Sequence, residues 1–216
     1  MKHMNKPEDM ILCTGRVMHK NYNESTKRLF VVIGIFTPKN MLSRGASMET
    51  EDRFNRDFPA FIMDGKKAKE AFDSFEVGDH ISIRGHVNTE EVMRPVGNRT
   101  YRREWRTLLV ADEIHTDGSH NGYCNVLLGG EVIRVWKNPD QGHSLYVITV
   151  KMTLDNGEVR RASFVYFDRN MEMEPKVGDF VTTEGIIQTK RIPAEDGRRA
   201  VNLLSIVSRF LVIDRN

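Results

Sequence analysis

A short motif occurs twice in this sequence, and its two copies limit the folds that the chain can adopt. Residues 77–87, VGDHISIRGHV, recur at 177–187 as VGDFVTTEGII, so that Val-Gly-Asp and a later glycine keep the same spacing 100 residues on. A second pair, Gly15-Arg16-Val17 and Gly130-Glu131-Val132, is separated by 115 residues, so the first copy is longer before its Val-Gly-Asp turn. Two copies of one fold are the economical explanation, and a chance match of a common turn is the alternative.

Both copies have the pattern of short β-strands, because their apolar segments are rich in Val, Ile, Phe and Thr and are bounded by Gly, Asn, Pro and Asp. The strands are expected at 10–18, 28–36, 58–63, 80–88 and 104–114, and again at 125–135, 144–154, 159–167, 180–188 and 200–213. Only 66–75 predicts a helix, since Ala68, Ala71, Phe72 and Phe75 recur at helical spacing. The matching segment of the second copy, 168–176, is too short and is interrupted by proline.

Five strands with a helix between the third and fourth are the layout of the oligonucleotide-binding (OB) fold, a Greek-key barrel. Glycine in the first and fourth strands fits the sharp bends of a small closed barrel. The sequence therefore predicts a mainly all-β chain of two tandem five-stranded OB barrels, with one short helix in the first. The predicted domains are 1–117 and 123–216, joined by a polar turn at 117–122.

Composition narrows the class of protein less than the repeat does. The net charge is +2 with a pI near 8.5, which neither requires nor excludes a nucleic-acid partner. No apolar run approaches the ~18 to 20 residues that cross a bilayer, and the start has no secretory signal, so a cytoplasmic protein without a membrane role is expected. Cys13 and Cys124 are expected to be small buried hydrophobes, since two cysteines give neither a disulfide framework nor zinc-ligand spacing.

Basic residues gather in the loops through which OB barrels bind, those between strands 1 and 2 and between strands 4 and 5. These loops are 19–28 and 89–106 in the first copy, and 134–138 with the loop beyond and 190–199 in the second. Acidic residues concentrate elsewhere, at 49–52, 70–76 and 171–174. A solvated charged hairpin is the alternative for any one loop, but the recurrence at matching positions favours a surface for phosphates.

The candidate site residues are therefore cations for phosphates and flat side chains for bases. The cations are Lys20, Arg28, Arg84, Arg94, Arg99, Arg102, Arg103, Arg106, Arg134, Lys137, Lys190, Arg191, Arg198 and Arg199. The chief stacking candidates are Tyr101, Trp105 and Trp136, whereas the strand aromatics Tyr22, Phe30, Phe58, Tyr146, Phe164 and Tyr166 more often face a core. Alternation places Phe164 and Tyr166 on one face, and the Tyr166 hydroxyl favours that pair as the outer one.

Two segments of the first copy follow a known pattern: 58–85, with Gly65, Lys66, Ala68, Gly78 and Gly85, and 86–114, with Gly97, Tyr101 and LVADEI at 109–114. Through these residues about half the chain resembles the bacterial and phage single-stranded DNA-binding (SSB) proteins. It implies an OB fold and sequence-independent binding of single-stranded DNA, protecting it in replication, recombination or repair. It also places Phe58 where the family has a base-stacking tryptophan.

Two departures from that family bear on partners. The usual family member has one OB domain and assembles to supply four, whereas two domains are expected here; a homodimer would restore that number, and a monomer is equally allowed. The sequence ends at 212–216 directly after a strand, without the family's acidic tail tip. Recruitment of repair enzymes by such a tip is therefore not expected, which is compatible with a phage or mobile-element origin.

Two other functions are alternatives to the binding of single-stranded DNA. Catalysis is not expected, because no phosphate-loop or dinucleotide motif is present and the seven histidines are scattered, so neither a metal nor a cofactor is predicted. A protein-interaction or dimerisation module remains open, because fold does not fix function. Trp136 and the Tyr166 face would then anchor an interface. The sequence does not distinguish RNA from DNA as the bound strand.

Overall fold

The computed structural model describes residues 6–38, 54–97, 100–116, 122–140, 143–168, 174–192 and 201–215. Within these residues it forms eleven strands and one helix, which confirms the mainly all-β fold class. In chain order the elements are β1 (Glu8–Asn23), β2 (Arg28–Pro38), β3 (Phe54–Asp57), β4 (Ala60–Asp64), α1 (Lys66–Ser74), β5 (His80–Gly97), β6 (Thr100–Thr116), β7 (Tyr123–Asp140), β8 (His143–Thr153), β9 (Val159–Asp168), β10 (Phe180–Ile192) and β11 (Val201–Asp214).

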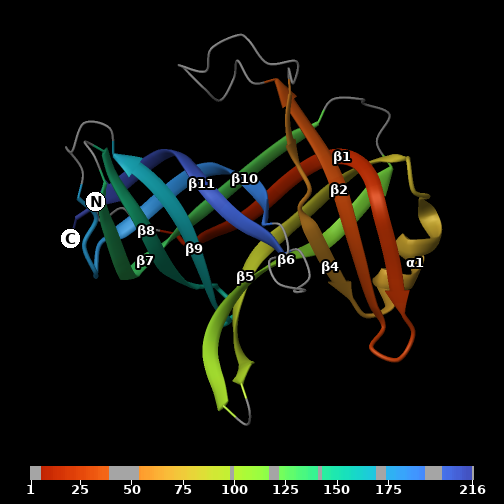
Figure 1. Ribbon diagram of the computed structural model, residues 1–216, viewed down its shortest axis with the longest axis horizontal. Helices are drawn as coiled ribbons and strands as arrows, with labels where there is room; N and C mark the ends of the chain where they lie inside the picture. Colours follow the sequence, from red (N-terminus) through yellow and green to blue (C-terminus); the bar gives the residue numbers. More distant parts are fainter. Residues whose placement is uncertain are drawn as a thin grey trace.

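The strands close into two five-stranded rings of the same order (Figure 1). In the first ring β1 is followed by β2, β4, β6 and β5, which returns to β1; in the second β7 is followed by β8, β9, β11 and β10, which returns to β7. The third and fifth strands of each ring run parallel, and the other pairs are antiparallel. This is the strand order of OB Greek-key barrels. The short strand β3, which pairs with the end of β2, was not predicted.

The helix α1 lies at one end of the first barrel (Figure 1) and confirms the helical spacing at 66–75. It turns Ala68 and Ala71 into the core, where both side chains are buried. The described residues between β9 and β10, 174–179, form no helix. The domain boundary between 117 and 123 stays a prediction, because residues 117–121 lie outside the described residues.

The repeated Val-Gly-Asp motif is a turn that fastens the fourth strand of each barrel to its first strand. In the first barrel the Gly78 N–H donates to the Val17 carbonyl at 2.9 Å, and the Val17 N–H donates to the Asp79 carbonyl at 2.8 Å. Gly78 has a φ of 104°, a backbone conformation that favours glycine. The second barrel repeats both hydrogen bonds at the same two distances, with a φ of 94° at the glycine; its residues are Val132, Gly178 and Asp179.

The first strands of the two barrels pair with each other and so join the barrels in one sheet. Residues 8–14 of β1 lie antiparallel to residues 123–129 of β7, and only after this segment does each strand pair with the second strand of its own barrel. The change of partner falls at Gly15 in β1 and at Gly130 in β7. A Cβ on either glycine would lie 2.6 Å from a carbonyl oxygen, that of Gly34 or that of Lys151. Glycine is therefore required where the second strand approaches.

We call the paired segments 8–14 of β1 and 123–129 of β7 the seam between the barrels. Buried polar and thiol groups lie along it. The carboxylate of Asp9 on β1 accepts the Val87 N–H of the first barrel at 2.8 Å and a guanidinium N–H of Arg160 on β9 at 3.2 Å. Burial raises the pKa of Asp9, although both hydrogen bonds lower it. Cys13 and Cys124 are paired residues of the seam, with sulfur atoms 2.9 Å apart. Both are buried and free, as the sequence predicted, but their proximity was not predicted.

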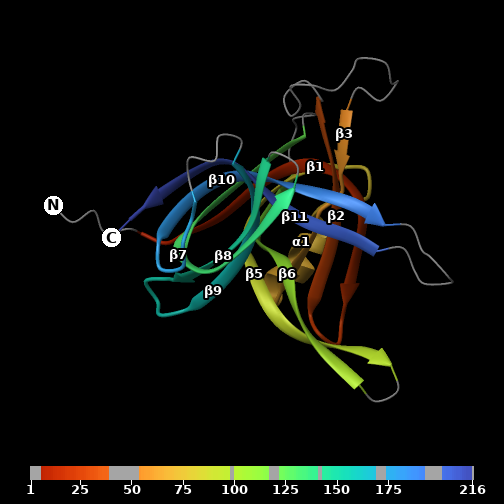
Figure 2. The ribbon, with the colours of Figure 1, turned by 60° about the vertical axis from the view of Figure 1, so that its left-hand side comes forward.

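Two hairpins are longer than the strands predicted for them. β5 and β6 stay paired from the barrel to Gly97 and Thr100, and β10 and β11 stay paired to Ile192 and Val201. The β5–β6 hairpin projects well beyond the barrels (Figures 1 and 2). The sequence indicated basic loops here, because these segments lack the regular alternation of apolar and polar residues that identifies a half-buried strand.

The change of strand partner at Gly130 gives a first test of this fold. Gly130→Ala should lower the free energy of unfolding by about 1 to 3 kcal/mol, because the added Cβ meets backbone rather than a flexible side chain. Urea denaturation measures the change, with Glu131→Ala, at the exposed neighbouring position, as the control. Equal stability of the two variants would contradict the close approach at residue 130.

Candidate nucleic-acid interface

OB barrels bind on an outer strand face flanked by two hairpins, and in the first barrel this face lies on β2 and β4. Side chains alternate along β2, so that Leu29 and Val31 are fully buried whereas Phe30 is 37% exposed. Phe58, just before β4, lies edge-on to Phe36 with ring centroids 6.4 Å apart. We define the first groove as the hollow of about 380 Å³ lined in part by Phe30, Val32, Phe58, Ile62, Arg106 and Leu204.

One border of the first groove belongs to the second barrel. Thr189 on β10 donates its backbone N–H to the Asp57 carboxylate at 2.6 Å, and its hydroxyl accepts the Phe58 N–H at 2.7 Å. Burial raises the pKa of Asp57, while the hydrogen bonds from Thr189 lower it. These contacts hold the β10–β11 hairpin, with Leu204, against the face that carries Phe58. The first groove is therefore built by both barrels.

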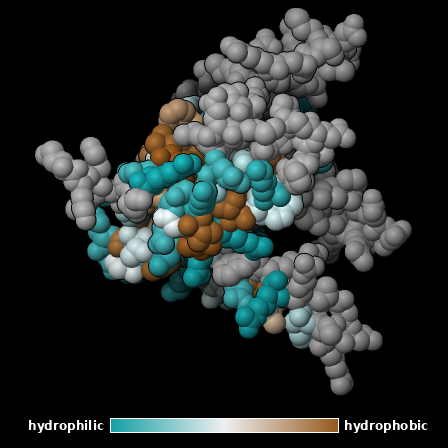
Figure 3. Space-filling view, turned by 90° about the vertical axis from the view of Figure 1, so that its left-hand side faces the viewer, coloured by the Kyte–Doolittle hydropathy of each residue, from teal (hydrophilic) through white to brown (hydrophobic). Residues whose placement is uncertain are grey.

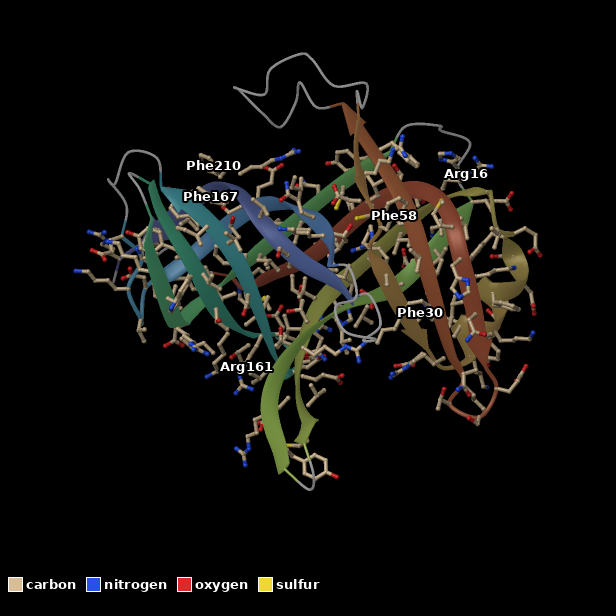
Figure 4. All side chains as sticks on the ribbon, in the orientation of Figure 1. Arg16, Phe30, Phe58, Arg161, Phe167 and Phe210 are labelled. Carbon is tan, nitrogen blue, oxygen red and sulfur yellow. The ribbon has the colours of Figure 1, made fainter. Side chains whose placement is uncertain are left out.

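The second groove lies on the outer face of β7, β8 and β9 and has a volume of about 650 Å³. We define it by its lining residues Thr89, Arg134, Trp136, Thr149, Arg161 and Ser163. Trp136 is 48% exposed, and the hydroxyls of Thr149 and Ser163 lie 2.9 Å apart. Thr89 comes from β5 of the first barrel, and Figure 4 shows Arg161 beside the base of the β5–β6 hairpin.

The two grooves have the same construction on either side of the β1–β7 pairing. Each barrel contributes a strand face to its own groove and a part of its strand 4–5 hairpin to the groove of the other barrel. Each groove combines exposed aromatic surface with arginine: Phe30 and Phe58 with Arg106 in the first, and Trp136 with Arg134 and Arg161 in the second. Such a combination offers stacking surface for bases and positive charge for phosphates.

Several predicted cations have carboxylate partners near the grooves. Arg28 pairs with Asp64 at 2.6 Å and Arg103 with Glu91 at 3.1 Å, in exposed positions where an ion pair contributes little stability. Lys137 lies 5.3 Å from the Tyr146 ring centroid and 3.3 Å from a Glu174 oxygen, and its pKa is raised by Tyr146 and then by Glu174. A phosphate would have to compete with these carboxylates.

Lys20 is placed differently from the prediction. Its ammonium donates to the backbone carbonyls of Phe72, at 2.8 Å, and Phe75 at the end of α1, and it pairs with Glu76 at 3.0 Å. Only 9% of the side chain is exposed. A cation at a helix C-terminus satisfies carbonyls that have no partner within the helix. Lys20 therefore holds α1 on the barrel, and we omit it from the contact set.

The expected outer pair on β9 is wrong. Phe164 is buried at 1% exposure and Tyr166 packs against the core, stacked on Tyr146 with centroids 6.3 Å apart. Phe167, on the opposite face, is 47% exposed. The prediction took the Tyr166 hydroxyl as a sign of an exposed side chain. A tyrosine can instead pack its ring against the core and keep its polar tip toward the surface.

The other predicted residues divide into two groups. Arg84, Tyr101 and Lys190 are exposed on β5, β6 and β10, with Tyr101 at 64%. Arg99, Arg198 and Arg199 lie outside the described residues, as do the side chains of Arg94, Arg102, Trp105 and Arg191.

Sequence reasoning missed Arg161, Thr89, Thr149 and Ser163, which all line the second groove. A signal for two of them was present on β9. The alternation was read with its two faces exchanged: Ala162 and Phe164 face the core, so Arg161 and Ser163 point outward. Thr89 had no such signal, because its role depends on how the barrels meet.

Within the described ranges, no three His, Cys, Asp or Glu side chains gather closely enough to hold a metal ion. The helix of the described chain is too short and too polar to cross a membrane.

Comparison with known proteins supports the fold. No protein-family model matches the sequence, and no curated protein matches it at a significant level. Among solved structures, the wild-type single-stranded DNA-binding protein from Thermus aquaticus is similar, with a TM-score of 0.68, 12% identity, and coverage of 98% of this chain and 95% of that chain. A deletion mutant of the same protein gives a TM-score of 0.65 at 11% identity, covering 99% and 97% of the two chains. The chain therefore shares the fold of an SSB-like protein over nearly its whole length.

The position of Lys20 gives a prediction for stability. Lys20→Met keeps the apolar stem but removes the charged hydrogen bonds to the α1 carbonyls, and should lower the free energy of unfolding by about 1 to 2 kcal/mol. Chemical denaturation measures the loss, and Lys27→Met in the exposed β1–β2 turn is the matched control. An unchanged midpoint would return Lys20 to the candidate contacts.

Proposed function

We propose that this protein binds single-stranded DNA without chemically altering it. The observation that carries the proposal is the pairing of exposed aromatic rings with arginines in two grooves, each completed by the other barrel. The similar structures add support, because their titles describe a single-stranded DNA-binding protein. Bases stack on Phe30, Phe58 and Trp136, and phosphates lie against the arginines of the same grooves.

This chemistry binds a strand without reading its sequence. Every base has a flat face, and stacking on an aromatic side chain contributes ~1 to 3 kcal/mol per base. Cations release the counterions of the phosphates, which makes affinity depend on salt. In this proposal Arg106, Arg134 and Arg161 serve the phosphates. The two domains, 1–117 and 123–216, act as one binding unit because the seam joins them.

A second function, a dimerisation module, is favoured by one observation. The second barrel exposes Phe167, Phe210 and Val212 on its neighbouring strands β9 and β11, with Phe210 at 64%. Figure 3, which looks onto that end of the molecule, shows hydrophobic residues grouped among hydrophilic ones. A second copy of the chain is the partner in this alternative. Native mass measurement at low and high concentration tests it, and a monomer throughout would exclude it.

The stacking prediction separates these two functions. Trp136→Ala should weaken binding to oligo-dT by about 1 to 3 kcal/mol, because one stacking surface is lost while the fold is retained. Phe210→Ala removes an exposed aromatic that lines neither groove and should leave this affinity unchanged. Fluorescence anisotropy with labelled oligo-dT and oligo-U measures both variants on DNA and RNA. Equal losses in the two variants would contradict stacking at Trp136.

The phosphate prediction concerns the salt dependence. The logarithm of the affinity should fall linearly with the logarithm of salt concentration, and Arg134→Gln should reduce the slope by about 0.7, the share of one single-strand phosphate. Arg209→Gln makes the same charge change on exposed β11 and is the control. Titrations at several salt concentrations give the slopes. If both variants change the slope equally, the effect comes from net charge and not from the second groove.

A further inference from the structure

Two thiols face each other near one end of the seam. Cys13 on β1 lies directly opposite Cys124 on β7 in the antiparallel register, and their sulfur atoms are 2.9 Å apart. Directly opposed residues of antiparallel strands project to the same face of the sheet. Here that face is the core, because Ile11 and Val126, the next opposed pair on it, are buried as the cysteines are. The fold therefore brings together two nucleophilic groups that line neither groove.

The register of the strands by itself satisfies the geometry of a disulfide between these two cysteines. Opposed residues of antiparallel strands have Cα atoms ~4.5 or ~5.5 Å apart, depending on whether the pair is hydrogen-bonded. Both separations fall within the ~4.4 to 6.8 Å that a disulfide spans. A bond between the sulfurs of Cys13 and Cys124 therefore requires rotation of the two side chains and no rearrangement of the backbones.

Cys124 is the thiol that a reagent in solution reaches first. It is 7% exposed, compared with 1% for Cys13, and it follows Tyr123, which begins the strand and is 50% exposed. Among the pairings of the described strands, β10 reaches β7 only as far as Val126, so at Cys124 the strand is bonded to β1 alone. Such strand ends open locally more readily than strand centres. The pKa of Cys13, by contrast, is raised well above its ordinary value by burial and then by Cys124, which makes it a poor nucleophile while the seam is closed.

We propose that Cys13 and Cys124 form a disulfide that locks the two barrels together, made by exchange with a small-molecule disulfide such as oxidised glutathione. The Cys124 thiolate attacks one sulfur of the small disulfide, which forms a mixed disulfide and releases one small thiol carrying the Cys124 proton. Cys13 then loses its proton and attacks the Cys124 sulfur, so that the mixed disulfide breaks and a second small thiol leaves with that proton. The two cysteines give up two electrons and two protons, and the small disulfide takes up the same number.

The lock acts on the joint that positions the barrels. It closes a loop between residues 111 positions apart, and a long loop restricts the unfolded chain strongly. Because the bond crosses the seam, it holds β1 to β7 even when the hydrogen bonds between them open. The contacts from Thr189 to Asp57 and Phe58, which complete the first groove, depend on that joint. Oxidation therefore strengthens the arrangement of the barrels whether or not the chain binds DNA.

Equilibration with glutathione tests the lock on the unaltered chain. Mixtures of reduced and oxidised glutathione are added in buffer and in urea at which the chain is unfolded, and mass spectrometry after acid quenching measures the intramolecular disulfide. Folding should raise the equilibrium constant for this disulfide about 30- to 1,000-fold, because the folded chain holds the thiols in bonding geometry. By the same thermodynamic cycle, the oxidised chain should melt about 5 to 15 °C above the reduced chain.

Cys124→Ala is the matched control, because it keeps Cys13 and cannot form the bond. Glutathione should leave the melting temperature of this variant unchanged. Equal constants in buffer and in urea, a disulfide between two chains, or a reaction that stops at the mixed disulfide would each overturn the lock. A disulfide that forms without raising the melting temperature would overturn it as well. None of these measurements uses DNA, so a failure of the lock leaves the proposed function standing, and a failure to bind oligo-dT leaves the lock standing.

Discussion

The structure depends on one shared strand edge. A β-strand has two hydrogen-bonding edges, and β1 uses one for β5 and divides the other between β7 and β2. β7 divides its edge in the same way between β1 and β8. The division works only if the first strand of each barrel can change abruptly from the partner barrel's first strand to the second strand of its own barrel, and the glycines at 15 and 130 allow this. The repeated Gly-x-Val in the sequence therefore marks the place where each barrel's first strand leaves the joint between the barrels.

The joint also determines where the grooves lie. Because β1 and β7 run antiparallel, the two barrels have opposite orientations along the shared sheet. The hairpin between the fourth and fifth strands of each barrel therefore lies against the outer strand face of the other barrel. Thr189 reaches Asp57 and Phe58 in one direction, and Thr89 reaches the face of Trp136 in the other. A single barrel would have an open face at either place. The buried contacts at Asp9 and Asp57 then keep these composite surfaces in one arrangement.

The elements that the sequence predicted are those specified by local patterns. Strands with a buried side, the helix with Ala68 and Ala71, and the Val-Gly-Asp turns all follow from spacing or from backbone requirements of single residues. The predictions failed where a side chain's role depends on distant contacts. Lys20 belongs to the end of α1, 52 residues away from its partner Phe72, and Tyr166 packs on Tyr146. Thr89 acquires its position only when two barrels meet, which no local pattern indicates.

The same distinction explains how this fold persists at 12% identity to the Thermus aquaticus protein while no sequence family matches. The barrel requires alternation of apolar residues, which Val, Ile, Leu and Phe satisfy interchangeably, and glycine at a few close approaches. A groove that stacks bases and neutralises phosphates likewise requires flat rings and cations, not particular residues at fixed positions. The barrel pattern and the groove chemistry both tolerate wide substitution. Two chains can therefore share this fold while few of their residues are identical.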